Sequence, residues 1–155
     1  MAKMIYGERI GRTAELRTGC SAFILDPMGE RILLTRRADN GQWCLPGGAM
    51  EAGESLAECC IREVWEETGL TVRVLQLVGV YSTPNRIVTY PDGNQWQIVS
   101  HNFEAEVIGG NLILSDETTE FGYFSPEEIA QMDVMEHHRE IIADALARQE
   151  AAFIR

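Results

Sequence analysis

The chain has 155 residues, of which 45% are hydrophobic and 24% charged, proportions typical of a globular protein. Its net charge of −11 and pI near 4.7 argue against a broad basic surface for duplex nucleic acid or for an anionic membrane. The length predicts one domain over residues 1–155, and no apolar stretch predicts a signal peptide or a membrane span, so we expect a cytoplasmic protein.

The first third of the chain favours two strands joined by a tight turn. Residues 14–26 are mostly apolar, as in a strand covered on both faces. Asp26 to Gly29 is typical of a turn, and residues 30–37 return as a second strand, so we expect a hairpin. Residues 43–45 form a short extended segment before a glycine pair. Residues 1–12 indicate only a short strand or arm.

A strongly capped helix is predicted over residues 56–68. Ser55 is a favourable N-cap, and Glu58 three residues later completes a capping box. Gly69 follows the last turn, where the backbone takes a positive φ.

Three glutamates of this helix, Glu63, Glu66 and Glu67, lie beside its apolar stripe instead of opposite it. At i, i+3 and i+4 spacing their negative charges repel one another. A solvated face of an acidic protein is one interpretation. The other is a divalent cation, because carboxylate oxygens at this spacing suit Mg²⁺ or Mn²⁺, and Mg²⁺ usually binds substrate phosphates as well.

Four strands and two helices are predicted after the capped helix. The strands cover residues 71–82, 86–90, 95–107 and 121–124, with a turn at 91–94, a break at 108–111 and an acidic loop at 115–120. A helix begins at Ser125, where an N-cap, a proline and a capping box coincide. A final helix over about 135–149 turns Ile141, Ile142, Ala145 and Leu146 inward. One strand-rich layer between helices predicts an α+β protein built as an α/β/α sandwich.

The cysteines include no C-x-x-C pair. Disulfides and a zinc site are alternatives, but buried free thiols in a reducing compartment agree better with the spacing of Cys20, Cys44, Cys59 and Cys60.

The helix and the turn before it resemble the signature of the Nudix hydrolase family, G-x5-E-x7-R-E-U-x-E-E-x-G-U, where U is a bulky aliphatic residue. All nine specified positions between Gly48 and Leu70 are filled, which is very unlikely by chance. The segment from Arg37 to Gly48 and the acidic segment before Ser125 extend the resemblance over most of the chain. The resemblance implies the Nudix fold with a central mixed sheet, and a homodimer.

The resemblance also implies a reaction. It is divalent-metal-dependent cleavage of a nucleoside diphosphate linked to another moiety X, such as a nucleotide sugar, into nucleoside monophosphate and phospho-X, by water attack on phosphorus. An (oxidised) nucleoside triphosphate pyrophosphohydrolase is the alternative. A non-catalytic nucleotide-sensing module and an acidic interaction protein with an accidental match are two further readings.

Several residue roles follow from the resemblance. Glu63 and Glu67 are the expected metal ligands, Glu66 a third ligand or the group that orients water, and the Gly47 carbonyl a further ligand for Mg²⁺ or Mn²⁺. Arg62 either holds a carboxylate such as Glu54 in position or forms a simple i, i+4 pair with Glu66. Outside the signature, the general base is expected from the acidic loop, with Glu117 and Glu120 as candidates and a solvated turn as the alternative.

Substrate contacts are expected from cations and an aromatic ring. The candidates for the phosphates are Arg36, Arg37 and Arg86, for which surface charge is the alternative. Trp96 is placed to stack on a base, although strand aromatics more often pack in a core. His101 is expected to be structural, and His137 and His138 to be a surface pair on a helix.

Overall fold

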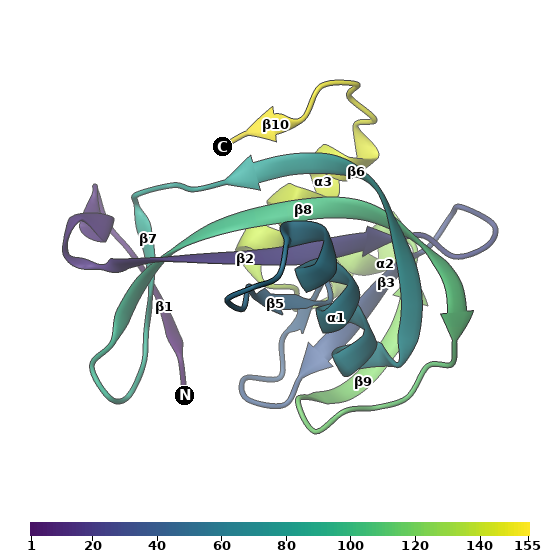
Figure 1. The fold of residues 1–155 in the computed structure, drawn as a ribbon, viewed down its shortest axis with the longest axis horizontal. Helices are drawn as coiled ribbons and strands as arrows, with labels where there is room; N and C mark the ends of the chain where they lie inside the picture. The colour runs from purple at the N-terminus through teal and green to yellow at the C-terminus, as the bar shows by residue number, and fades with distance from the viewer.

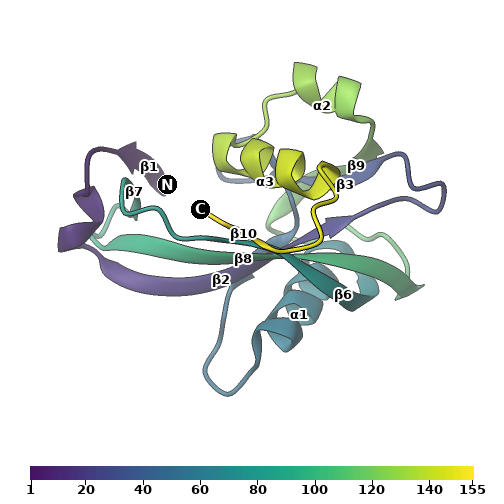
Figure 2. The same ribbon diagram turned by 90° about the horizontal axis from the view of Figure 1, so that it is seen from above.

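The computed structural model describes residues 1–155, in which two β-sheets lie between helices (Figure 1). Helix α1 covers one face of the large sheet, and α2 and α3 lie on the opposite side (Figure 2). The helices are α1 (Leu56–Thr68), α2 (Pro126–Gln131) and α3 (Glu136–Leu146), with a 3₁₀ turn at Ile10–Thr13. The strands are β1 (Lys3–Tyr6), β2 (Glu15–Ile24), β3 (Ile32–Arg37), β4 (Trp43–Cys44), β5 (Gly47–Ala49), β6 (Leu70–Tyr81), β7 (Arg86–Thr89), β8 (Gln95–Gly110), β9 (Thr118–Phe124) and β10 (Phe153–Ile154).

The large sheet is mixed, as predicted. Strand β8 is its centre, because it pairs parallel with β2 and antiparallel with β6 and β7. On the far edge of β2 lies the short antiparallel strand β5, which carries the glycine pair. The long pairing of β2 with β8 therefore supports the segment that leads into α1. Together with the helices on both sides, this arrangement confirms the predicted α/β/α sandwich.

The predicted hairpin between the first two strands is wrong. A turn does form after β2, with the Gly29 amide donating to the Asp26 carbonyl, but only the bridge between Leu25 and Ile32 joins the flanking segments. Strand β3 instead pairs with β4 and β9 in a separate three-stranded sheet. Along Gly19–Ser21 both edges of β2 are occupied, by β8 and β5, and the returning chain finds its partners in β4 and β9.

The remaining elements follow the predictions with shifts at their ends. Helix α1 has the predicted bounds, capping box and C-terminal glycine, and the β7–β8 hairpin forms. Strand β8 continues through the expected break to Gly110, and β9 begins earlier, at Thr118. Helix α3 ends at Leu146, whose side chain is exposed instead of buried. Strand β10 was not predicted.

Two clusters of buried side chains lie on the two faces of the sheets. Alternate residues of β2 enter different clusters, since Ala22 and Ile24 pack beneath α1 while Phe23 packs toward α3. The four cysteines are buried and free, which confirms that prediction. None of the three helices is both long and apolar enough to span a membrane.

Candidate active site

Gly47 and Gly48 begin β5 and form the bend, called the glycine turn below, that lies between β2 and α1. Gly47 pairs with Ser21, and a side chain at Gly47 would overlap the backbone of Cys20 and Ser21, so only glycine permits this approach. The Gly47 amide donates a hydrogen bond of 3.0 Å to Oε2 of Glu67. The next residue, Gly48, lies directly against the carboxylate of Glu63. The turn thus contacts both glutamates predicted as principal metal ligands.

Arg62 holds together the carboxylates of the signature. Its guanidinium donates two hydrogen bonds to Glu54, of 3.0 and 2.8 Å, and also contacts Glu63 at 2.9 Å and Glu66 at 3.1 Å. A further bond of 3.0 Å to the Ala49 carbonyl ties the guanidinium to β5. Arg62 therefore makes both of the contacts considered from the sequence, the one that holds Glu54 in position and the i, i+4 pair with Glu66. The bidentate pair with Glu54 holds the pKa of that carboxyl at about 2.

Glu67 and Glu63 are carboxylates in an environment that disfavours their charge. Burial, opposed by the Gly47 hydrogen bond and reinforced by Glu63 and Glu117, raises the pKa of Glu67 to about 8. Burial also raises the pKa of Glu63, although Arg62 acts in the opposite direction. Glu117 of the acidic loop adds to the negative potential at both groups. Three acidic side chains thus converge here with one arginine among them.

These oxygen atoms fit a hard divalent cation. Glu67 is 9% exposed, accepts one hydrogen bond and has no cation within ion-pair distance, so most of its lone pairs are free. Carboxylate oxygens suit Mg²⁺ or Mn²⁺. No group of three or more His, Cys, Asp or Glu side chains is already arranged to hold an ion. Backbone oxygen, water or substrate phosphate would therefore have to complete the ligand set, as is usual for Mg²⁺.

A cleft of about 530 Å³ opens on this turn and has the opposite charge to the chain as a whole. Among its lining residues Asp39 is the only acidic one, whereas four are cationic. The cations are Lys3, Arg17, Arg37 and Arg86. Gly47 and Gly48 form part of its wall, so the cleft reaches the backbone that contacts Glu67 and Glu63. A cation-lined cleft in a protein of net charge −11 is a local site for an anion.

The structure separates the residues predicted to contact substrate. Arg37, Arg86 and Trp96 line the cleft, and Arg37 forms a bidentate pair with Asp39. Arg36 and Glu120 lie outside it, in an ion pair with each other at 2.6 Å. Of the two candidate bases, Glu117 is the one whose charge raises the pKa of Glu63 and Glu67.

Trp96 is held by two neighbours in the cleft. The guanidinium of Arg17 lies 3.5 Å from the centre of its ring, and the Tyr90 ring is tilted against it at 4.6 Å. Arg17 was not among the predicted site residues, because its place opposite Trp96 depends on the parallel β2–β8 pairing.

The two adjacent histidines are not a surface pair, which corrects the sequence interpretation. Both line the cleft, and Nδ1 of His138 accepts a hydrogen bond of 3.0 Å from the Leu45 amide. The proton of a neutral His138 ring is therefore on Nε2. Burial lowers the pKa of His138 to about 3, with Arg37 and Arg86 acting in the same direction, so the ring is neutral at pH 7. Only the fold brings α3 over the glycine turn, so no local pattern marked these residues.

The family model of the NUDIX domain matches residues 15–145. A MutT-like protein of Streptomyces ambofaciens is 40% identical over 101 residues, covering 65% of this chain and 59% of that protein. An ADP-ribose pyrophosphatase of Methanocaldococcus jannaschii is 38% identical over 117 residues, covering 74% and 64%. A putative 8-oxo-dGTP diphosphatase of Bacillus subtilis is 32% identical over 113 residues, covering 72% and 69%. The chain thus spans about six tenths of the length of the first two relatives.

The fold has solved relatives as well. The crystal structure of a MutT protein from Methanosarcina mazei superposes with a TM-score of 0.69 at 28% identity, covering 88% of this chain and 99% of that one. The family match includes the glycine turn, α1 and the cleft residues from Arg17 onward, whereas Lys3 and its neighbours in the cleft wall lie outside it. The chain therefore belongs to the Nudix hydrolase family.

Proposed function

We propose that the chain, as one Nudix domain, is a divalent-metal-dependent pyrophosphohydrolase that cleaves a nucleoside diphosphate linked to a moiety X into nucleoside monophosphate and phospho-X. The observation that carries this proposal is the cation-lined cleft, which ends at Gly47 and Gly48 beside the glutamates Glu63 and Glu67. A diphosphate in the cleft would place its phosphorus atoms next to these carboxylates. The remaining volume accommodates the nucleoside or X.

Each signature residue has a role in this proposal. Glu63 and Glu67, with the Gly47 carbonyl, would hold Mg²⁺ or Mn²⁺, which when bound neutralises phosphoryl oxygens and lowers the pKa of a bound water. Arg62 fixes the carboxylates of Glu63 and Glu66 through its hydrogen bonds. Because Glu66 is exposed and next to this pair, it can orient the attacking water or serve as a third ligand.

Water attack on phosphorus forms one P–O bond and breaks the P–O anhydride bond, and the water must lose a proton. Glu117 is the proposed acceptor, because it is the acidic-loop carboxylate whose charge acts on both Glu63 and Glu67. Glu120 is already paired with Arg36. The phosphate leaving group takes up the negative charge that develops on the bridging oxygen.

Cations and an aromatic ring would position the substrate. Arg37 and Arg86 are proposed to contact phosphates and Trp96 the base, since all three line the cleft. The ADP-ribose pyrophosphatase relative favours a sugar-bearing X. The putative 8-oxo-dGTP diphosphatase relative favours the alternative, an oxidised nucleoside triphosphate. On the strength of the family resemblance, we also propose that the enzyme is cytoplasmic and that it forms a homodimer. Light scattering tests the dimer.

The test is a product screen with Mg²⁺ and with Mn²⁺ over nucleotide sugars, dinucleotides, coenzymes and nucleoside triphosphates. Release of nucleoside monophosphate and phospho-X is expected. Release of pyrophosphate from triphosphates alone would favour the alternative. Binding of a nucleotide without any turnover would instead indicate a sensing module and would overturn the enzymatic proposal. Arg31→Gln, which removes an exposed ion pair with Glu128, is the matched control for the site variants.

A further inference from the structure

Arg86 is a buried cation without a partner. The residue is 9% exposed, yet its guanidinium takes part in no ion pair or hydrogen bond in the structure, unlike Arg37, Arg62 and Arg155. The only side-chain nitrogen or oxygen that is both inaccessible and unpaired is Oδ1 of Asn102. The nitrogens of Arg86 must therefore reach open space. Burying an uncompensated charge is costly, which calls for a ligand that supplies the missing partner.

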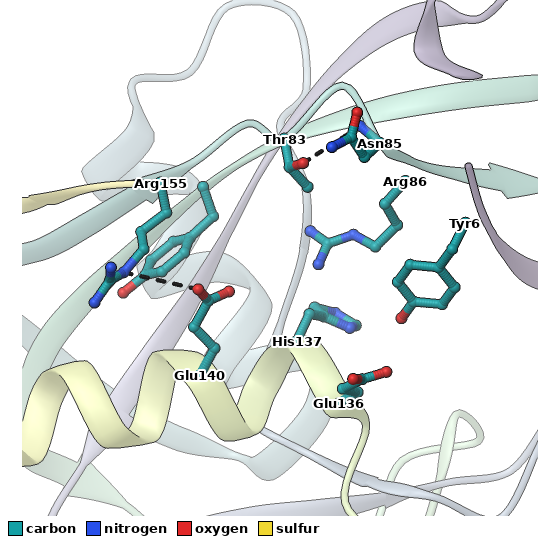
Figure 3. Close-up of a pocket in the computed structure, with 9 residues that line it drawn as sticks. Tyr6, Thr83, Asn85, Arg86, Glu136, His137, Glu140 and Arg155 are labelled. Atoms are coloured by element: carbon teal, nitrogen blue, oxygen red, sulfur yellow. Dashed lines mark hydrogen bonds and ion pairs between the residues drawn. The ribbon is translucent and has the colours of Figure 1, made fainter. Parts of the chain in front are cut away.

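The open space that Arg86 reaches is the junction of two cavities. Arg86 and His137 line both the cleft described above and a second cavity of about 570 Å³. Figure 3 shows Arg86 directed toward His137 on the first turn of α3. The other residues that line the second cavity are mostly polar, namely Tyr6, Tyr81, Thr83, Asn85, Glu136, Glu140 and Arg155. The cleft thus continues past Arg86 into a pocket rich in hydrogen-bonding groups.

The carboxylates near Arg86 do not neutralise it. Glu136 and Glu140 act on its pKa in the upward direction, but burial is the larger effect and lowers that pKa. Neither carboxylate lies within ion-pair distance of Arg86, and Glu140 faces Arg155 at 3.7 Å. Tyr6 also faces this space. On the side of the cleft, Asp39 is the only acidic lining residue, so an anion can approach Arg86 from there.

The start of α3 adds donors at the same place. No side chain caps this helix at Met135, and although the His138 amide donates to the Met135 carbonyl, the amides of Glu136 and His137 remain free. The positive end of a helix favours an anion, and an arginine offers a planar fork that matches two oxygen atoms. His137 remains neutral because burial lowers its pKa, and it can donate one further hydrogen bond.

We propose that Arg86 and the first turn of α3 form a subsite for an oxyanion, a phosphate or carboxylate carried by X, with the rest of X in the second cavity. This inference rests on the proposed function and narrows the role proposed there for Arg86, because it places the anion bound by Arg86 on X, away from the glycine turn. Arg86 would thus favour substrates whose X group carries a negative charge.

The test is a binding titration in EDTA, so that it does not depend on turnover. Ribose 5-phosphate and inorganic phosphate are titrated by calorimetry into the wild type, Arg86→Gln and the control Arg31→Gln. We expect Arg86→Gln to weaken binding of ribose 5-phosphate at least about tenfold, because it removes a charge-assisted bidentate contact, and Arg31→Gln to bind as the wild type does. Equal affinity of the wild type and Arg86→Gln would overturn the subsite.

Two further readouts separate the alternatives. A subsite for X predicts that ribose 5-phosphate binds more tightly than inorganic phosphate, whereas equal binding would mean a site for free phosphate and would overturn the assignment to X. The ligand-free Arg86→Gln protein should unfold at the same or a higher temperature. A lower temperature together with unchanged affinity would mean that Arg86 serves only to offset Glu136 and Glu140. Failure of the hydrolysis screen would leave these binding results standing.

Discussion

The amide of Gly47 donates a hydrogen bond of 3.0 Å to Oε2 of Glu67, twenty residues later in the chain. This contact joins the turn before α1 to the last turn of the same helix, and it orients a carboxylate that is otherwise buried without a cation. Because the bond leaves Oε1 free, the second oxygen of Glu67 is available to an ion or to water. The geometry of the turn therefore determines where the charge of Glu67 can act.

Replacing Glu67 by Gln should lower turnover by at least about a hundredfold, because it removes a charge that stabilises the transition state. The amide oxygen can still accept the bond from Gly47, so the fold should persist. Circular dichroism checks the fold, and product release checks the rate. Glu127→Gln, a change at an exposed residue of α2, is the matched control. A folded Glu67→Gln protein with near wild-type activity would contradict the site.

Addition of Mg²⁺ to protein treated with a chelator should raise the melting temperature. A ligand that binds only the native state stabilises it by about 2.7 kcal/mol at a hundredfold excess over its Kd. The carboxylates of Glu63 and Glu67 should gain the most, because burial and mutual repulsion disfavour their charges. Differential scanning calorimetry measures the shift. An equal shift in Glu67→Gln would place the ion elsewhere.

Helix α1 could be predicted to the residue because its signals are local. Ser55, Glu58 and Gly69 lie within the helix ends that they define, and the family signature falls on the same segment. The role of β3 could not be predicted in the same way, since its partners β4 and β9 are set by the free edges that the whole fold leaves. The turn at Gly29 can lead either into a hairpin with β2 or into a strand that pairs with other partners, so it does not distinguish the two.

The cleft shows the same limit. The glutamates of α1 could be predicted from their spacing on one helix, and Arg86 could be named as a candidate cation. His138 and Arg17 could not be predicted, because they come from different elements and reach the cleft only through sheet pairing and the packing of α3. The contact between Leu45 and His138 spans 93 residues, and no sequence pattern marks it. The excess of cationic side chains in the cleft of this acidic protein likewise arises only when the elements that line it come together.

Replacing Arg62 by Lys should lower kcat by roughly tenfold to a hundredfold, because a lysine ammonium cannot hold Glu54, Glu63 and Glu66 at once, and small displacements of catalytic groups cost that much. Steady-state kinetics measure the effect. Arg31→Lys, which alters an exposed pair with Glu128, should behave as the wild type does. Equal kinetics of both variants would mean that Arg62 does not position the carboxylates.

Replacing Asp144 by Asn should destabilise the protein by about 1–3 kcal/mol, because a buried group then faces donors that it cannot fully satisfy. The carboxylate of Asp144 is 6% exposed and accepts hydrogen bonds from Tyr81 at 3.0 Å and from Arg155 at 2.7 and 3.0 Å. Urea unfolding at pH 7 measures the change. A difference below about 0.5 kcal/mol, the size usual for surface substitutions, would contradict it.

The stability contributed by Asp144 should depend on pH in the acid range. Arg155 and Tyr81 hold the pKa of Asp144 below its usual range. An aspartate in the unfolded chain has a pKa of about 3.9. The stabilisation is therefore fully present above that pH and is lost as the pH falls through the pKa of the folded protein. As the pH is lowered from 7 to 2, the melting temperature of Asp144→Asn should therefore fall less steeply than that of the wild type. Parallel curves for both proteins would show that Asp144 does not contribute.

Alanine at the two neighbouring glycines should have opposite effects on fold and activity. At Gly47 the added methyl group would overlap the Cys20 carbonyl and the Ser21 backbone, which cannot move without breaking the β2–β5 pairing, so we expect a loss of about 1–3 kcal/mol. At Gly48 the three nearest atoms that it would overlap all belong to the Glu63 carboxylate, the end of a flexible side chain. Gly48→Ala should therefore fold normally but displace a metal ligand and lose most of its activity. Thermal unfolding and product release measure the contrast between the two proteins. Gly53→Ala is the control, because its added methyl group would meet no neighbouring atom and only its φ of 94° would cause strain. If Gly48→Ala kept full activity, Glu63 would not need to lie against the turn, and the site built on that contact would be wrong.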